Sequence, residues 1–151
     1  MVETGIAYWA SVTSANTTFE PVYCVELVVP DDRAKYWSDK GYKVKDLHMK
    51  NASGEPEYIG KALSIKRKAY DSKGQARPAP RLYDSNKEPL NELVGNGSEV
   101  NVQFNPWEVD NNFGHFKGMD FQAMQVLKLV RPNSRTEDGS EISPYGDGEE
   151  F

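Results

Sequence analysis

The sequence predicts a mostly β protein, a small barrel or sandwich of several short strands interrupted by one helix. Two observations support this. Apolar and polar residues alternate with a period of two in several stretches, as in half-buried strands. Glycine and proline together make up 21 of 151 residues and apolar residues only 38%, which fits a loop-rich β protein better than a helical one. The length suits one domain with a real core.

The first third of the chain predicts two strands and a helix. Residues 5–12 and 19–29 read as strands joined by a polar hairpin connection. A proline and two aspartates then stop the second strand and offer a helix N-cap, so a short helix is expected over residues 33–40, ended by Gly41. Residues 42–56 show no stable period and are expected to form a basic loop or a ragged helix.

The middle of the chain predicts a third strand over residues 58–70, with one small, basic and aromatic face. Residues 71–74 are expected to form a turn, residues 77–81 to be extended, and residues 82–84 to make a brief edge strand.

A long hairpin is expected at the end of the domain. In its first strand Val100, Val102 and Phe104 must face a core, because polar residues alternate with them. The second strand, residues 118–130, is expected to place five residues on one face: Phe121, Ala123, Gln125, Leu127 and Leu129. Residues 105–117 between the strands are rich in Asn, Asp and Gly and are expected to form a loop that carries aromatic side chains. Upstream, residues 95–97 are expected to be a plain turn.

The sequence gives little support for a catalytic function. His48 and His115 have no second His or Cys at ligand spacing, so a zinc site is not expected. Phosphate loops, nucleophile elbows and Cys/His pairs are missing as well, which makes an enzyme the weaker hypothesis. The single cysteine, Cys24, is expected to be a buried thiol. The sequence has no apolar run near the ~20 residues that cross a bilayer and no signal-peptide pattern at its start, so a cytosolic location is expected.

Charge is distributed unevenly along the chain. The net charge is -5, yet residues 33–81 carry 13 bases against five acids. Residues 137–151 carry six acids and no base, and this Gly-, Ser- and Pro-containing segment is expected to be disordered. It ends in Phe151, so it could be captured by a basic pocket on a partner or lie across the protein's own basic groove.

Residues 66–81 interleave cations with an aromatic ring. Lys66, Arg67, Lys68 and Tyr70 are followed by three more basic residues. Single-stranded nucleic acid favours this combination, since its backbone needs positive charge and its exposed bases stack on flat rings at about 1–3 kcal/mol per base. A run of lysines is also common on solvated surfaces, and aromatic residues such as Tyr36 and Trp37 are often core residues, so the pattern alone leaves both interpretations open.

The order of these features resembles the single-stranded DNA-binding proteins of tailed phages, particularly the short-tailed T-odd type. The resemblance rests on residues 23–30 leading into a helix, residues 94–102, Trp107, residues 121–129 and an acidic tail that ends in Phe151. It implies an OB-fold, a five-stranded barrel with one short helix, which coats and protects single-stranded DNA during replication, recombination and repair in the cytoplasm of the infected host cell. It also implies that the tail recruits the phage DNA polymerase and the primase-helicase and takes part in a homodimer. This chain departs from the family in its shorter tail and its compressed region between Gly41 and Glu57.

These observations predict an OB-fold domain over residues 1–132 and a disordered acidic tail over residues 133–151, with no catalytic residues, cofactor or metal. Phosphates are expected to contact Lys61, Lys66, Lys68, Arg77, Arg81 and Lys117, and bases to stack on Tyr58, Tyr70, Trp107 and Phe113. The partner-binding tail residues are Glu137, Asp138, Glu141, Asp147, Glu149, Glu150 and Phe151. The alternatives are a β-barrel interaction adaptor that binds no DNA and, more distantly, a metal-dependent nuclease.

Overall fold

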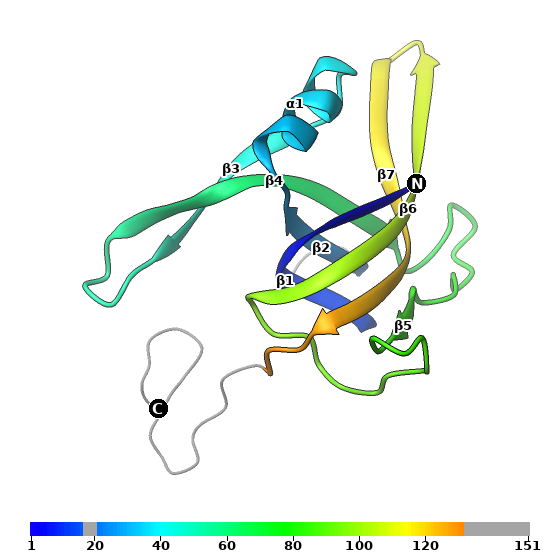
Figure 1. Cartoon of the computed structure of the whole chain (residues 1–151). Coiled ribbons are helices and arrows are strands. Elements are labelled where there is room, and N and C mark those ends of the chain that lie inside the picture. Colours follow the sequence, from blue (N-terminus) through cyan, green and yellow to red (C-terminus); the bar gives the residue numbers. More distant parts are fainter. Residues whose placement is uncertain (17–20, 132–151) are drawn as a thin grey trace.

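The computed structural model describes residues 1–16 and 21–131. These residues form seven strands and one helix (Figure 1). In chain order the elements are β1 (Val2–Asn16), β2 (Val22–Val28), α1 (Asp31–Asp39), β3 (Val44–Lys50), β4 (Pro56–Lys68), β5 (Arg81–Tyr83), β6 (Ser98–Asn111) and β7 (Gly114–Lys128). The acidic tail expected from residue 133 onward lies outside the described residues. Within the described part of the chain, no helix has the length and apolarity to span a bilayer.

Five strands close a barrel in the order β1, β2, β4, β7, β6 and back to β1. All the neighbouring pairs are antiparallel except β4 and β7, which meet in parallel where Lys66 is opposite Asp120. β3 and β5 are added at the outside, on β4 and β7. This is the five-stranded OB-fold barrel with one short helix that the resemblance predicted, and the prediction is confirmed.

The core lies inside the barrel, and β6 supplies its centre. Val100, Val102 and Phe104 are fully buried, as their alternation predicts. The face predicted for β7 points into the core at Phe121 but not beyond Gln122. Gln103 pairs with Ala123 and Phe104 pairs with Phe121, so Gln122 is an extra residue in a β-bulge, and the bulge reverses which residues face inward. Beyond it Met124 and Val126 are buried, whereas Leu127 is 39% exposed.

The expected loop or ragged helix at residues 42–56 is wrong, because residues 44–50 form β3. This strand pairs antiparallel with the outer part of β4, and the two extend away from the barrel (Figure 1). Of its seven residues only Leu47 is buried. A strand with both faces largely in solvent has no alternating pattern of apolar and polar residues. β3 could therefore not be predicted from the sequence.

The expected loop over residues 105–117 is also wrong. β6 continues to Asn111 and β7 begins at Gly114, so only residues 112–113 make the turn. The Asn111 side chain accepts a hydrogen bond from the backbone N–H of Phe113 (2.8 Å), which closes this turn. The two strands therefore form a long hairpin that projects past the barrel beside α1 (Figure 1).

Helix α1 forms where predicted and is fixed to the barrel by a buried carboxylate. Its Trp37 packs edge-on against Phe104, with ring centres 5.4 Å apart. Glu3 on β1, only 5% exposed, accepts a 2.8 Å hydrogen bond from the Trp37 indole N–H and further hydrogen bonds from Arg33. Gly41 ends the helix, as expected, with a φ of +91° that suits glycine.

Two smaller expectations concern residues 95–97 and Cys24, and the structure confirms the first of them. Residues 95–97 form the plain turn that was predicted, and Ser98 closes it by bonding the Gly95 carbonyl through its hydroxyl (2.8 Å). Cys24, expected to be buried, is only partly buried, because it lies on the outer side of β2. Burial nevertheless raises the pKa of its thiol above the ordinary value.

Candidate nucleic-acid interface

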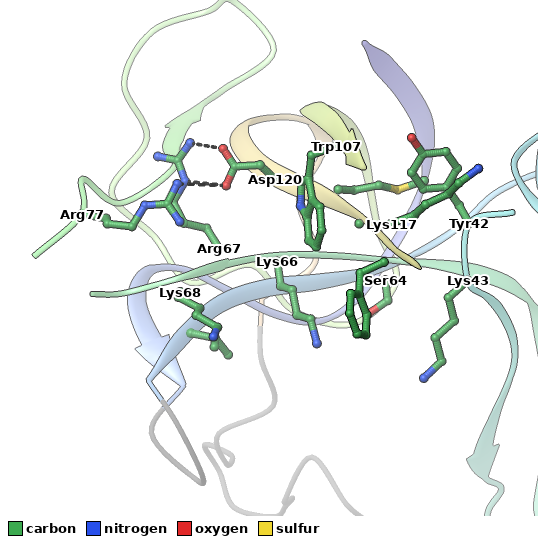
Figure 2. A pocket seen from close by; sticks show the side chains of 14 residues that line it. Tyr42, Lys43, Ser64, Lys66, Arg67, Lys68, Arg77, Trp107, Lys117 and Asp120 are labelled. Atoms are coloured by element: carbon green, nitrogen blue, oxygen red, sulfur yellow. Dashed lines mark hydrogen bonds and ion pairs between the residues drawn. The ribbon is translucent and has the colours of Figure 1, made fainter. Parts of the chain in front are cut away.

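A cleft of about 710 Å³ opens between the outer surface of β4, the segment after α1 and the β6–β7 hairpin (Figure 2). In an OB-fold, the second and third barrel strands and the loop between the fourth and fifth strands form the surface that binds oligonucleotides. β2, β4 and the β6–β7 hairpin hold those places here. The cleft is lined by Val22, Tyr42, Lys43, Ser64, Lys66, Arg67, Lys68, Arg77, Trp107, Phe116, Lys117, Gly118, Met119 and Asp120.

Positive charge dominates this cleft, with six basic side chains and one carboxylate among its lining residues. Ser64, Lys66 and Lys68 alternate along β4 and so share its outer face, whereas Leu63 and Ile65 face the core. Among the described residues, no carboxylate forms an ion pair with Lys43 or with Lys66. These ammonium groups are therefore available to an anion.

The one carboxylate, Asp120, holds two arginines at the end of the cleft. Arg67 donates to both of its oxygens, from Nε at 3.0 Å and from Nη2 at 2.7 Å, and Arg77 donates from Nη2 at 3.3 Å. In Figure 2 both guanidinium groups lie against this carboxylate. The hydrogen bonds from Arg67 to Asp120 hold the pKa of its guanidinium above the ordinary value. The cluster retains one net positive charge, with the two guanidinium groups held in fixed positions.

Lys117 ties the hairpin to the end of α1. Its ammonium donates a hydrogen bond to the carbonyl oxygen of Lys40 and lies 5.5 Å from the centre of the Tyr42 ring. The negative end of the helix dipole favours a cation at this position. The contact fixes the hairpin beside the helix and places a further positive charge at the wall of the cleft.

Trp107 presents a flat ring to the cleft because its neighbour across the hairpin is a glycine. Trp107 pairs with Gly118, and a Cβ atom on Gly118 would come within 2.4 Å of the indole Cζ2 and 2.6 Å of Cε2. The indole therefore lies directly against the backbone of β7, yet the residue remains 42% exposed. Phe116 lies on the same wall and is also exposed.

The cleft brings together half of the predicted contact residues, namely Lys66, Lys68, Arg77, Trp107 and Lys117. The others lie elsewhere. Tyr58 and Lys61 are on the β3–β4 hairpin, where Tyr58 packs against His48 and the Lys61 ammonium bonds Asp46 at 2.6 Å. The rest are spread over the turn after β4 (Tyr70), β5 (Arg81) and the tip of the β6–β7 hairpin (Phe113, 89% exposed).

Sequence reasoning did not predict the other lining residues of the cleft, among them Tyr42, Lys43, Arg67 and Phe116. Tyr42 and Lys43 precede β3, the strand that carries no pattern. Arg67 lies on the inward-facing side of β4, and only its pairing with Asp120, 53 residues later, gives it a place at the cleft. Phe116 could have been found, because a two-residue turn at residues 112–113 would have placed it on the same hairpin face as Trp107 and Val109.

Metal chemistry gains no support from the described residues, which contain no group of three or more His, Cys, Asp or Glu side chains able to hold a metal ion.

Comparison with solved structures places the barrel among known folds. The chain superimposes on gp2.5, a single-stranded DNA-binding protein encoded by bacteriophage T7, with a TM-score of 0.57, 14% sequence identity and coverage of 95% of this chain and 98% of that one. The fold is that of phage single-stranded DNA-binding proteins. The protein of this kind from bacteriophage Enc34, in complex with single-stranded DNA, matches with a TM-score of 0.55 and 14% identity over 86% of each chain.

A second structure of the Enc34 protein gives a TM-score of 0.56 at 16% identity, covering 89% of this chain and 84% of that one. No family model matches the sequence, and no curated protein matches it significantly. The similarity to these two phage proteins is therefore a similarity of fold, at 14–16% sequence identity.

Proposed function

We propose that the cleft binds single-stranded DNA. The observation that carries this proposal is the combination of six basic side chains with an exposed, fixed indole on the surface that OB-folds use for oligonucleotides. The fold shared with two phage single-stranded DNA-binding proteins supports it.

In this proposal the charges and the ring have separate tasks. Lys43, Lys66, Lys68 and Lys117 neutralise phosphates, and the two guanidinium groups held by Asp120 add one net charge. Trp107 stacks one base. Bases paired inside a duplex cannot reach the ring, so the cleft favours single strands. Phe113, Tyr58 and Tyr70 remain predicted stacking positions outside the cleft, and Lys61, already bonded to Asp46, remains a predicted phosphate contact.

The protein would coat and protect single-stranded DNA during replication, recombination and repair, in the cytoplasm of the infected host cell. Coating requires no covalent chemistry, so the proposal includes no enzymatic activity. Incubation with labelled single-stranded DNA and Mg²⁺ tests this part, because intact DNA is expected and cleavage would favour the nuclease alternative.

The acidic tail is proposed to compete with DNA for the cleft and to recruit the phage DNA polymerase and primase-helicase. Residues 137–151 carry six acids and end in Phe151, which complements a cleft with six basic side chains. Deleting these residues should tighten DNA binding and abolish polymerase binding. Weaker DNA binding after truncation would contradict the competition. Sedimentation of the full and truncated chains would test a homodimer held through the tail.

A fluorescence titration tests the proposed function. Oligo-dT should quench the emission of Trp107 and bind far more tightly than a duplex of equal length at low salt. A Lys66→Ala, Lys68→Ala double variant should lose most of this affinity while unfolding at the wild-type temperature. Absence of quenching and binding in the wild type would instead favour an interaction adaptor.

A further inference from the structure

A second hollow, of about 530 Å³, lies on the outer face of β5, β6 and β7. Arg81 and Tyr83 of β5 line it from one side, together with Lys87 from the loop that follows. Side-chain amides of β6 and β7 line it from the other side: Asn101, Gln103 and Gln125. We call this hollow the amide groove.

Two short segments of chain connect the cleft to the amide groove. Arg77 lines the cleft and Arg81 lines the groove, and only Pro78, Ala79 and Pro80 separate them. Four extended residues span about 13 Å. β7 provides a second link, because it runs from Asp120 in the cleft to Ala123 in the groove, a rise of about 10 Å. Arg81 pairs with Ala123, so the two links lie side by side.

The chemistry of the amide groove suits a nucleic acid strand. Arg81 and Lys87 are exposed, and of the described residues that line the groove none carries a carboxylate. The amides are already oriented, since Asn101 donates to Gln125 (3.1 Å) and Gln125 donates to the Ser85 carbonyl (3.2 Å). Amides retain both donors and acceptors for base edges, while the two cations can pair with phosphates.

Lys87 is held in a backbone conformation that ordinarily takes glycine. Residues 51–55, 71–75 and 84–88 form three turns with the same hydrogen bonds, in which the first side chain accepts the backbone N–H groups of the third and fifth residues. The fourth residue is glycine in the first two turns, with φ of +79° in both. In the third it is Lys87, with φ of +65°. Such backbone strain concentrates at functional positions, and here it places an ammonium group in the amide groove.

We propose that single-stranded DNA leaves the cleft along residues 77–81 and continues into the amide groove, where Arg81 and Lys87 each hold a phosphate. This inference rests on the proposed function of the cleft. It adds a second section to the binding site, so the affinity should increase with oligonucleotide length beyond the length that fills the cleft.

The test is a length series of oligo-dT from about 4 to 16 nucleotides, the range that single OB-folds occupy. Full-length wild type is compared with an Arg81→Ala, Lys87→Gly double variant, and Lys73→Ala serves as a control that removes a lysine outside both hollows. The double variant should bind the shortest oligonucleotides within twofold of the wild type and the longest at least tenfold more weakly. For the longest, its salt slope should be lower by about 1.4, as expected for two lost phosphate contacts.

Lys87→Gly alone separates binding from folding. Glycine suits the positive φ, so the variant should unfold at the wild-type temperature or above while binding long oligonucleotides less tightly. Lys87→Arg should retain wild-type binding. If the wild type and the double variant bind with equal affinity at every length, the proposed DNA site in the amide groove is contradicted. An equal loss of affinity at every length would contradict it as well. If the wild type fails to bind even the shortest oligonucleotides that fill the cleft, it is the proposed function that fails.

Discussion

Gly118 should be as important for DNA binding as the Trp107 ring that lies on it. A methyl group on residue 118 would come within 2.4 Å of the indole, and the β7 backbone cannot retreat because it is paired with β6 on this side. In Gly118→Ala the ring must therefore swing away from its place at the wall of the cleft. The substitution removes no charge and adds one carbon atom.

The size of the effect follows from the exposed area of the ring. A tryptophan side chain presents roughly 250 Å², and Trp107 is 42% exposed, so roughly 100 Å² is available to a base. Covering half to all of that area contributes about 1.2–2.5 kcal/mol at 25 cal/mol per Å², within the range for one stacked base. Losing it corresponds to a rise in Kd of about 8-fold to 70-fold.

The assay is equilibrium binding of fluorescently labelled oligo-dT to wild type, Gly118→Ala, Trp107→Ala and Trp107→Phe, with thermal unfolding measured in parallel. Both alanine variants should weaken binding to a similar degree, and Trp107→Phe should lose less because a flat ring remains. Wild-type affinity in Gly118→Ala together with a loss in Trp107→Ala would refute the role of the glycine. Wild-type affinity in both would refute stacking on Trp107.

Three further predictions concern the surroundings of the cleft. Asp120→Asn releases two arginines from their shared carboxylate, so DNA affinity at low salt should rise and the salt slope should steepen by about 0.7; an unchanged slope would mean that the added net charge meets no phosphate. Glu3→Ala leaves the Trp37 indole N–H without its acceptor, and denaturant unfolding should show a loss of about 1–3 kcal/mol; wild-type stability would contradict this anchoring role. Burial raises the pKa of the Cys24 thiol, so less thiolate is present at pH 7 and iodoacetamide should alkylate it more slowly than free cysteine, with a rate that increases with pH. Equal rates at pH 7 would contradict this.

The barrel could be predicted from the sequence wherever one face of a strand is buried. Val100, Val102 and Phe104 alternate strictly with polar residues, and all three face the core. The same logic failed in β7 because strict alternation was continued through Gln122, where a bulge reverses the inward face. β3 failed for a different reason, since solvent reaches most of both its faces.

The cleft was predictable only in part. Lys66 and Lys68 stand out as cations on one face of a strand, and Trp107 stands out as an aromatic residue in a polar segment. The remaining features of the cleft depend on residues far apart in the sequence. Asp120 accepts hydrogen bonds from Arg67, and Gly118 leaves room for the Trp107 indole. Lys87 gave no signal in the sequence, because its role rests on a positive φ in a turn whose two counterparts contain glycine.

The salt dependence of single-stranded DNA binding tests the central claim most directly. The four lysines of the cleft and the net charge of the Asp120 cluster give about five positive charges. If all of them meet phosphates, a plot of log Kobs against log salt concentration should have a slope of about -3.5 for single strands. For the Lys66→Ala, Lys68→Ala variant the slope should be shallower by about 1.4. An affinity of the wild type that stays constant between low and moderate salt would contradict electrostatic binding in the cleft.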